Sequence, residues 1–226
     1  MSTIVLKVGG AVAARSAQAV LELAKEHSVC VVHGAGPQIS AEMEAAGVPV
    51  QFIGGRRVTT ADGIKIVRSS LVAVNTALAE AIGDQAVALH GDEIGLQARQ
   101  VEELGLVGDP QPSRPQAVID ALAAGKIPVV MPLAEGPLNV NADDAAAALA
   151  VGLGVDELRF LTDVEGFMLD GVVLDSLDAT EAEALMAGGT LDPTILPKLG
   201  AAVIAAKGGV NAAIGRTIIA ATGVAA

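Results

Sequence analysis

Short runs of apolar, mostly β-branched residues alternate along this chain with longer segments in which apolar residues recur every three or four positions. The short runs predict buried strands at 3–8, 29–33, 86–90, 127–131, 158–162 and 217–221. The longer segments predict helices at 16–27, 37–46, 60–82, 114–124, 142–153 and 179–187. Such alternation is typical of an α/β architecture with a mainly parallel central sheet covered on both faces.

Ligands of parallel sheets bind beyond the carboxyl ends of the strands, so we expect functional residues directly after the predicted strands. The apolar runs within 97–107 and 172–174 are too short for a strand–helix–strand crossover and therefore predict hairpins. The proline-rich segment 108–115 is the best candidate for a hinge between two lobes.

Composition narrows the class of protein. With 226 residues, of which 52% are hydrophobic, the chain can bury a core without disulfides or metal ions. Its formal net charge of -12 argues against nucleic-acid partners, which need a clustered excess of lysine and arginine. The single cysteine, Cys30, lies in an apolar run and is predicted to be buried. Lys7 and two glycines interrupt the apolar start, so we expect no signal peptide, no membrane span and a cytoplasmic location.

Glycine-rich turns follow the first two predicted strands. The first, after Lys7, offers a cation and backbone amides to phosphate oxygens, although a lysine at a strand end can also simply reach water. The second, at 33–38, exposes amides at the start of a helix. It is not a Walker A loop, because the closing lysine and hydroxyl are absent. We expect His33 to orient this loop rather than to act as a base.

An arginine pair, Arg56 and Arg57, follows two glycines just before the longest predicted helix. A guanidinium can hold a carboxylate through two parallel hydrogen bonds. We therefore expect one arginine to bind an anionic ligand and the other to be solvated.

Amides and carboxylates gather where the helix predicted at 142–153 begins. Asn141 is the expected N-cap, and Asp143 and Asp144 are favourable in the first turn. Capping requires only one of these side chains, so the remaining groups, with Asn139, are candidates for a ligand site. Lys198 near the start of a later apolar helix opposes the helix dipole, which favours an anionic partner, although solvent would serve equally.

Taken in this order, these elements resemble the amino acid kinase family and, within it, the acetylglutamate branch. The match is collinear from Ile4 to about Ala206, and Asn75 with the segments 104–108 and 126–130 also fits that branch. The resemblance implies a three-layer αβα sandwich with a mainly parallel central sheet.

The resemblance also implies a domain organisation and a reaction. Residues 1–226 would form a single domain, with a lobe for the acyl amino acid and dimerisation at 1–135 and a nucleotide-binding lobe at 136–226. The reaction would be ATP-dependent phosphorylation of the side-chain carboxylate of N-acetyl-L-glutamate. ATP and Mg²⁺ would be required, with Mg²⁺ carried by ATP rather than by protein side chains.

Residue roles are carried over by position. The implied catalytic residues are Lys7, Lys198 and Asp143. The implied phosphate- and ATP-binding residues are Gly9, Gly10, Gly34, Ala35, Gly36, Thr162 and Asp163. The implied substrate-binding residues are Arg57, Asn139, Gly34 and Ala35.

These roles agree with the chemistry. A carboxylate is already ionised at pH 7, so the reaction needs no strong base, and its difficulty is to bring two anions together. Two lysines, backbone amides and Mg²⁺ would offset that repulsion, and Asp143 fits better as an organiser of the lysines than as a base.

The chain departs from the family pattern in several places. Ala35 stands where glycine is common, Thr76 stands where lysine is frequent, and 131–138 is short for the hairpin that covers the substrate. We see no amino-terminal extension of the kind that joins arginine-sensitive relatives into hexamers. The resemblance therefore implies a homodimer without arginine feedback.

Other interpretations stay open. The substrate could be another acidic amino acid derivative, of the aminoadipate type, or free glutamate. From another class, the chain could be a catalytically silent relative that binds ATP or an acyl amino acid. Retention of both lysines and Asp143 speaks against the silent binder. An NAD-binding oxidoreductase lacks support, because no G-x-G-x-x-G turn follows the first strand.

Overall fold

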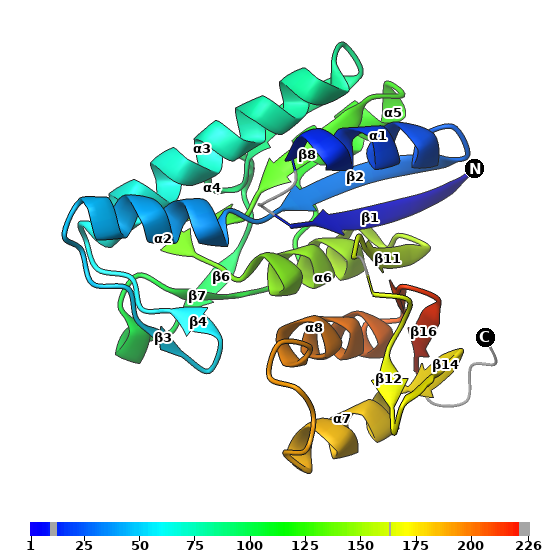
Figure 1. Ribbon diagram of the computed structural model, residues 1–226. Helices are drawn as coiled ribbons and strands as arrows, with labels where there is room; N and C mark the ends of the chain where they lie inside the picture. Colours follow the sequence, from blue (N-terminus) through cyan, green and yellow to red (C-terminus); the bar gives the residue numbers. More distant parts are fainter. Residues whose placement is uncertain (10–12, 163, 222–226) are drawn as a thin grey trace.

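The computed structural model describes residues 1–9, 13–162 and 164–221, so the predictions for Gly10 and Asp163 lie outside the described residues. Figure 1 shows a central sheet with helices on both faces. Among the described residues the sheet has eight strands in the order β14-β16-β15-β11-β1-β2-β8-β5. In chain order they are β1 (Ser2–Val8), β2 (His27–His33), β5 (Ala86–His90), β8 (Ile127–Met131), β11 (Glu157–Phe160), β14 (Ser176–Asp178), β15 (Asn211–Ile214) and β16 (Thr217–Ala220).

Neighbouring strands are parallel except β15 and β16, which confirms the predicted mainly parallel sheet. The helices are α1 (Ala13–Leu23), α2 (Gly36–Ala45), α3 (Gly63–Ile82), α4 (Gly91–Ile94), α5 (Gln116–Ala123), α6 (Ala142–Leu153), α7 (Ala179–Ala187) and α8 (Leu196–Lys207), with a short 3₁₀ turn, η2 (Glu102–Leu104). Successive side chains of a strand face opposite sides of the sheet, so β1 serves two cores. Ile4 and Leu6 pack in the core under α1 and α3, whereas Val5 packs in the core under α6 and α8. The three-layer αβα sandwich is confirmed.

Small hairpins complete the chain. They are β3 (Phe52–Ile53) with β4 (Arg56–Arg57), β6 (Ala98–Gln100) with β7 (Gly108–Pro110), β9 (Leu133–Ala134) with β10 (Leu138–Asn139), and β12 (Met168–Leu169) with β13 (Val172–Val173). Two of these, β6–β7 and β12–β13, form close to where the short apolar runs predict hairpins. The short segment 131–138 still forms a hairpin, β9–β10. The division into lobes and the hinge at 108–115 stay predictions.

The sequence pattern misplaces the end of one helix and misses two strands of the central sheet, β14 and β15. The predicted first helix runs to His27, but α1 ends at Leu23 and His27 is already the first residue of β2. Pairing with β1 explains the difference, because His27 lies opposite Ser2, whose hydroxyl is 2.6 Å from His27 Nδ1. The strand β15 is not predicted at all, because its alanine-rich sequence has little strand propensity and is buried against α8.

Cys30 is fully buried, as expected, and burial raises the pKa of its thiol to about 12. No helix in the described part of the chain is long and apolar enough to cross a membrane.

Candidate active site

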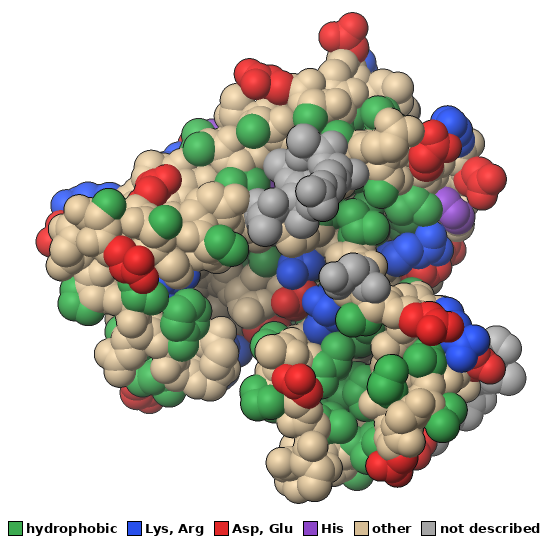
Figure 2. All heavy atoms as spheres, viewed as in Figure 1, with side chains coloured by type: hydrophobic (Ala, Val, Ile, Leu, Met, Phe, Trp, Pro, Cys, Tyr) green, Lys and Arg blue, Asp and Glu red, His purple; other side chains and the backbone are tan. Residues whose placement is uncertain are grey.

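The carboxyl ends of β1, β2 and β11 and the first turn of α6 meet at one edge of the sheet. The register of β1 puts Lys7 opposite Phe160 of β11 on one side and Val32 of β2 on the other. Because parallel strands end at the same edge, residues far apart in the sequence converge there. Figure 2 shows this edge as a hollow in which basic and acidic side chains lie together.

Asp143 joins the two lysines that the sequence singles out. Its Oδ1 lies 2.8 Å from Lys7 Nζ and 3.9 Å from Lys198 Nζ, and the three side chains are only 12–19% exposed. The ammonium of Lys198 also lies 5.3 Å from the centre of the Phe160 ring. Two ammonium groups that share one carboxylate leave a local excess of positive charge, which favours an incoming anion.

Asn141 fixes the start of α6, as expected for an N-cap. Its Oδ1 accepts hydrogen bonds from the backbone N–H groups of Asp143 at 2.8 Å and Asp144 at 3.3 Å. The cap sets the direction in which α6 leaves the sheet edge. It therefore holds the Asp143 carboxylate in front of the lysines.

The glycine turn after β2 is held from below by His33. This residue is fully buried, with Nδ1 3.3 Å from the Gly34 carbonyl oxygen and Nε2 3.0 Å from Asn75 Nδ2. Burial lowers the pKa of His33 to about 4, so the ring is neutral at pH 7. A buried neutral imidazole with both nitrogens engaged orients the loop, as predicted.

The amides of this turn are not equivalent. The Gly34 N–H donates to the carbonyl of Val8 at 3.1 Å, so this amide is engaged within the fold, and its contact with a phosphoryl group stays a prediction. Ala35 is buried and precedes α2, which has Pro37 in its first turn and no side-chain cap. The start of α2 therefore directs uncapped amides and the positive end of the helix dipole at the pocket.

Arg57 of β4 is buried against α2. One of its terminal nitrogens donates to the Gly36 carbonyl at 3.0 Å and to Ser40 Oγ at 2.8 Å, and the other lies 3.5 Å from Met43 Sδ. The guanidinium also stacks over the ring of Phe52, 4.6 Å from its centre. Burial lowers the pKa of Arg57, but a guanidinium remains charged at pH 7.

Asn139 is tied to the backbone beside Arg57. Its Nδ2 donates to Thr59 Oγ1 at 3.0 Å, and Thr59 Oγ1 donates to the carbonyl of Arg57 at 2.8 Å. The structure thus brings together the two residues predicted to hold a substrate carboxylate.

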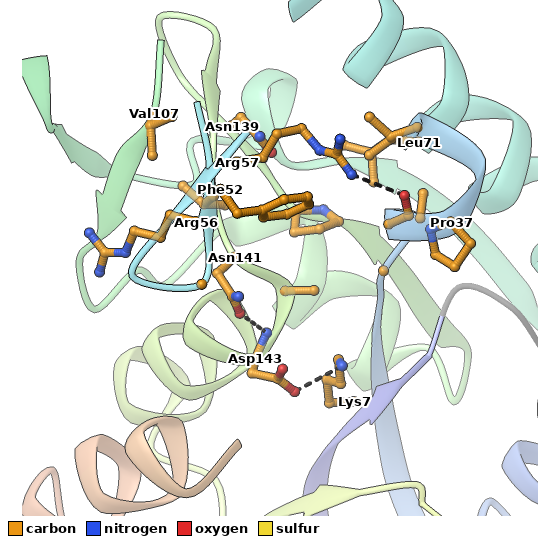
Figure 3. A pocket seen from close by; sticks show the side chains of 18 residues that line it. Lys7, Pro37, Phe52, Arg56, Arg57, Leu71, Val107, Asn139, Asn141 and Asp143 are labelled. Atoms are coloured by element: carbon orange, nitrogen blue, oxygen red, sulfur yellow. Dashed lines mark hydrogen bonds and ion pairs between the residues drawn. The ribbon is translucent and has the colours of Figure 1, made fainter. Parts of the chain in front are cut away.

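These groups surround a pocket of about 280 Å³. Figure 3 shows Lys7 and Asp143 on one side, Arg57, Phe52 and Asn139 on the other. The ionisable side chains that line it are Lys7, Arg56, Arg57 and Asp143, three cations and one anion in a chain of formal charge -12. A site with this excess of cations suits a small molecule that carries more than one negative charge.

A second cavity of about 510 Å³ adjoins the first between the β3–β4 hairpin and α8, and both are lined by Gly55, Arg56 and Asn141. Arg56 is not simply solvated, which corrects the expectation for the second arginine. It pairs with Asp109, and its other terminal nitrogen lies 3.7 Å from Asp144 Oδ2.

The remaining predicted residues lie near the same edge. Gly9 ends the described part of the first turn, and Thr162 follows β11, where its hydroxyl accepts a bond from the Val164 N–H at 3.4 Å. Neither lines the two cavities. Their roles, like those of the other site residues, stay predictions.

Sequence reasoning missed three residues that contact Arg57, namely Ser40, Phe52 and Thr59. Ser40 and Thr59 act through single hydroxyls, and such residues carry no signal in one sequence. Phe52 could have been found, because it is one of only three phenylalanines in a chain without tryptophan or tyrosine and it lies just before the glycine–arginine run.

Comparison with known proteins gives consistent matches. The model of the amino acid kinase family matches residues 2–216. An acetylglutamate kinase from Saccharopolyspora erythraea is 43% identical over 211 residues, covering 84% of this chain and 69% of that protein. One from Frankia casuarinae is 40% identical over 238 residues, covering 92% of this chain and 65% of the relative. The chain therefore spans about two thirds of the length of these relatives. The crystal structure of smu.665 from Streptococcus mutans matches with a TM-score of 0.84 at 27% identity, covering 96% of this chain and 98% of that one.

Proposed function

Because this chain belongs to the amino acid kinase family, we propose that it transfers the γ-phosphoryl group of ATP to the side-chain carboxylate of N-acetyl-L-glutamate, giving N-acetyl-glutamyl 5-phosphate for arginine biosynthesis. Relatives named acetylglutamate kinase at 43% and 40% identity support this substrate. The observation that carries the proposal is the sharing of Asp143 Oδ1 by Lys7 and Lys198 at the edge of a cationic pocket.

In the proposed reaction the acid binds in the smaller pocket. Arg57 and Asn139 would hold the α-carboxylate, which leaves the side-chain carboxylate to extend toward Lys7. Both carboxylates of the substrate are ionised at pH 7, so no residue needs to remove a proton. Attack on the phosphorus is then limited mainly by repulsion between the carboxylate and the γ-phosphate and by their alignment. Fixed positive charges offset the repulsion and hold the two groups in place.

Lys7 and Lys198 would stand on either side of the phosphoryl group in transfer and offset the negative charge that spreads over its oxygens. Asp143 would keep both ammonium groups in place between turnovers. Amides of Ala35 and Gly36, and of the turn after Lys7, would add hydrogen bonds that need no reorganisation during the reaction.

The nucleotide would lie on the side of Lys198, with Thr162 and Asp163 in its binding site. Phosphate oxygens accept hydrogen bonds from ammonium groups and backbone amides, so the lysines and glycine turns of the site fit a bound triphosphate. Mg²⁺ would arrive on the phosphates of ATP and supply further neutralisation of their charge.

We also propose a homodimer in the cytoplasm, where MgATP is available. Light scattering after gel filtration tests the oligomeric state, and a mass of one chain would contradict the dimer.

A substrate panel tests the reaction. Purified protein is incubated with MgATP and N-acetylglutamate, glutamate, aspartate or N-acetylaminoadipate, with ADP release and hydroxamate trapping of the acyl phosphate as readouts. Lys198→Ala serves as the inactive variant. Lys207→Ala is its matched control, because Lys207 lies at the other end of α8 and pairs with the exposed Glu183.

We expect trapped product with N-acetylglutamate, normal turnover in Lys207→Ala and a loss of at least about 100-fold in Lys198→Ala. Product only with the aminoadipate derivative would move the assignment to that substrate. No product with any acid, together with measurable binding of ATP, would favour the silent binder and overturn the proposal.

A further inference from the structure

Two side chains adjacent in sequence to central residues of the site have no role in the reaction proposed above. Arg56 precedes Arg57 on β4, and Asp144 follows Asp143 in the first turn of α6. Figure 3 shows the side chains of Arg56 and Arg57 extending in opposite directions from their strand. Arg57 extends toward α2, whereas Arg56 extends toward β7 and α6.

The Arg56 guanidinium lies between two carboxylates. It pairs with Asp109 of β7, and its second terminal nitrogen is 3.7 Å from Asp144 Oδ2. The side chains of Arg56, Asp109 and Asp144 are 30%, 26% and 18% exposed, so water screens these charges only in part. Asp109 has a second partner, Arg99 of β6, at 3.3 Å, but Arg99 is 79% exposed.

We propose that Arg56 and Asp144 form a positioning pair that fixes the strand carrying Arg57 relative to the helix carrying Asp143, an inference that rests on the proposed function. A single peptide bond separates each member of the pair from the residue it positions. A change in the pair is therefore passed to the site through the backbone. The distance between a substrate held by Arg57 and a phosphoryl group near Asp143 stays correct only while β4 and α6 keep their relative positions.

The pair should affect turnover more than binding. Among the described residues, the polar and sulfur partners of the Arg57 guanidinium are Gly36, Ser40 and Met43, all on α2. Its aromatic partner, Phe52, lies on β3, and none of these contacts involves Arg56. Loss of Arg56 therefore leaves the binding group in place but frees its strand to move against α6. Because a displacement of about 1 Å can cost roughly 100-fold in rate, the loss should appear mainly in kcat.

Charges around Asp144 make the pair sensitive to pH. Burial raises the pKa of Asp144 to about 6, the carboxylates of Asp143 on its own helix and Asp109 on β7 act in the same direction, and Arg56 on β4 opposes them. The residues of α8 that share a cavity with Asp144 bring no ionisable side chain. The pair is therefore charged at pH 7.5 and is lost as Asp144 takes up a proton below about pH 6.

Four variants test the pair: Arg56→Gln, Asp144→Asn, the double variant, and Arg99→Gln as the matched control. Arg99→Gln removes an arginine from the same Asp109 without touching Asp144. kcat and KM for N-acetylglutamate are measured from pH 5.5 to 8, with thermal unfolding at each pH.

We expect kcat to fall about tenfold in each single variant at pH 7.5, with KM changed less than about threefold, and no further loss in the double variant. In the unaltered protein kcat should fall below about pH 6, whereas in Asp144→Asn this fall in the pH profile of kcat should be absent. Asp144→Asn should be at least as stable as the unaltered protein at pH 7.5, which a merely structural role would not give.

The two proposals fail differently. If the unaltered protein is active and Arg56→Gln behaves like Arg99→Gln, or if the losses add in the double variant, the positioning pair is overturned alone. If the unaltered protein phosphorylates none of the acids, the proposed function and the pair fall together.

Discussion

The floor of the site and its hairpin wall are built in different ways. The floor consists of Lys7 at the end of a central strand, Asp143 in a capped helix turn and Lys198 on α8, all less than 20% exposed. The wall is the β3–β4 hairpin, two residues in each strand, whose Phe52 and Ile53 are about half exposed. The charges proposed to act on the phosphoryl group lie on long elements, and the groups proposed to hold the substrate lie on a short one.

This difference assigns separate tasks to the two regions. Electrostatic help for a transferring phosphoryl group is effective only if the donors are already in place, which long, buried elements ensure. The hairpin is tied to α2 through Arg57 and to β7 and α6 through Arg56, so it can present a binding group without carrying the charges beside the phosphoryl group. Changes in the floor should therefore reduce kcat, and changes in the wall side chains proposed to hold the substrate should mostly alter KM. Arg56 is the exception on the wall, because it joins β4 to β7 and α6 and is expected to act on kcat.

Removing a floor lysine should have the largest effect. Lys7→Ala leaves a single ammonium group beside Asp143, and we expect kcat to fall by about 1,000-fold or more with little change in the unfolding temperature. Lys25→Ala is the control, because Lys25 is 66% exposed and pairs with the exposed Glu22. Turnover of Lys7→Ala within tenfold of the unaltered protein would contradict the assignment of phosphoryl transfer to the floor.

Removing the wall arginine should have the next largest effect, of a different kind. Arg57→Gln loses the charge proposed to hold the substrate carboxylate, so we expect KM for N-acetylglutamate to rise about 100-fold and kcat to change less than tenfold. The unchanged KM for ATP provides an internal control. An equal fall in kcat with no change in KM would place Arg57 with the floor.

A fall in pH should change the stability of the fold in opposite directions through two titratable groups near the site, His33 and Asp144. His33 under the floor has a folded pKa of about 4, below its unfolded value near 6.5, so its contribution to stability is lost as pH falls through that window. Asp144 beside the wall has a folded pKa of about 6, above its unfolded value near 3.8, so its ionisation destabilises the fold at neutral pH and stability is regained as pH falls.

Between pH 7.5 and 5 the Asp144 effect should offset part of the His33 effect, leaving a net loss of about 1 kcal/mol from the two groups. Asp144→Asn removes the carboxylate whose protonation offsets the His33 effect. The free energy of unfolding of this variant in urea should therefore fall by about 2 kcal/mol over the same pH range. Asp120→Asn, an exposed carboxylate on α5, should keep the slope of the unaltered protein. Equal slopes in Asp144→Asn and the unaltered protein would show that Asp144 does not oppose the effect of His33.

The same contrast explains what the sequence could predict. Lys7, Asp143 and the glycine turn follow predicted strands or begin a predicted helix, so the rule for parallel sheets is enough to bring them to one edge. Lys198 joins them only through resemblance, because nothing in its helix fixes where that helix packs. Arg56 was expected in water, since its partners Asp109 and Asp144 lie far along the chain and no local pattern pairs them. Contacts between short irregular segments depend on tertiary packing, which hydrophobic periodicity does not encode.

The smallest expected effect sharpens the description of the wall. Phe52 is about half exposed, yet its ring lies 4.6 Å from the Arg57 guanidinium. A cation–π contact at such a site contributes about 0.5–1 kcal/mol, so Phe52→Ala should raise KM for the acid about threefold without changing kcat. Phe52→Leu keeps an apolar side chain but has no aromatic face and should behave like the alanine variant, whereas Phe52→Tyr should be normal. Ile53→Ala is the matched control, because Ile53 is equally exposed on the same strand. If Phe52→Leu has the KM of the unaltered protein, the ring acts as an apolar cover and not as a partner of Arg57.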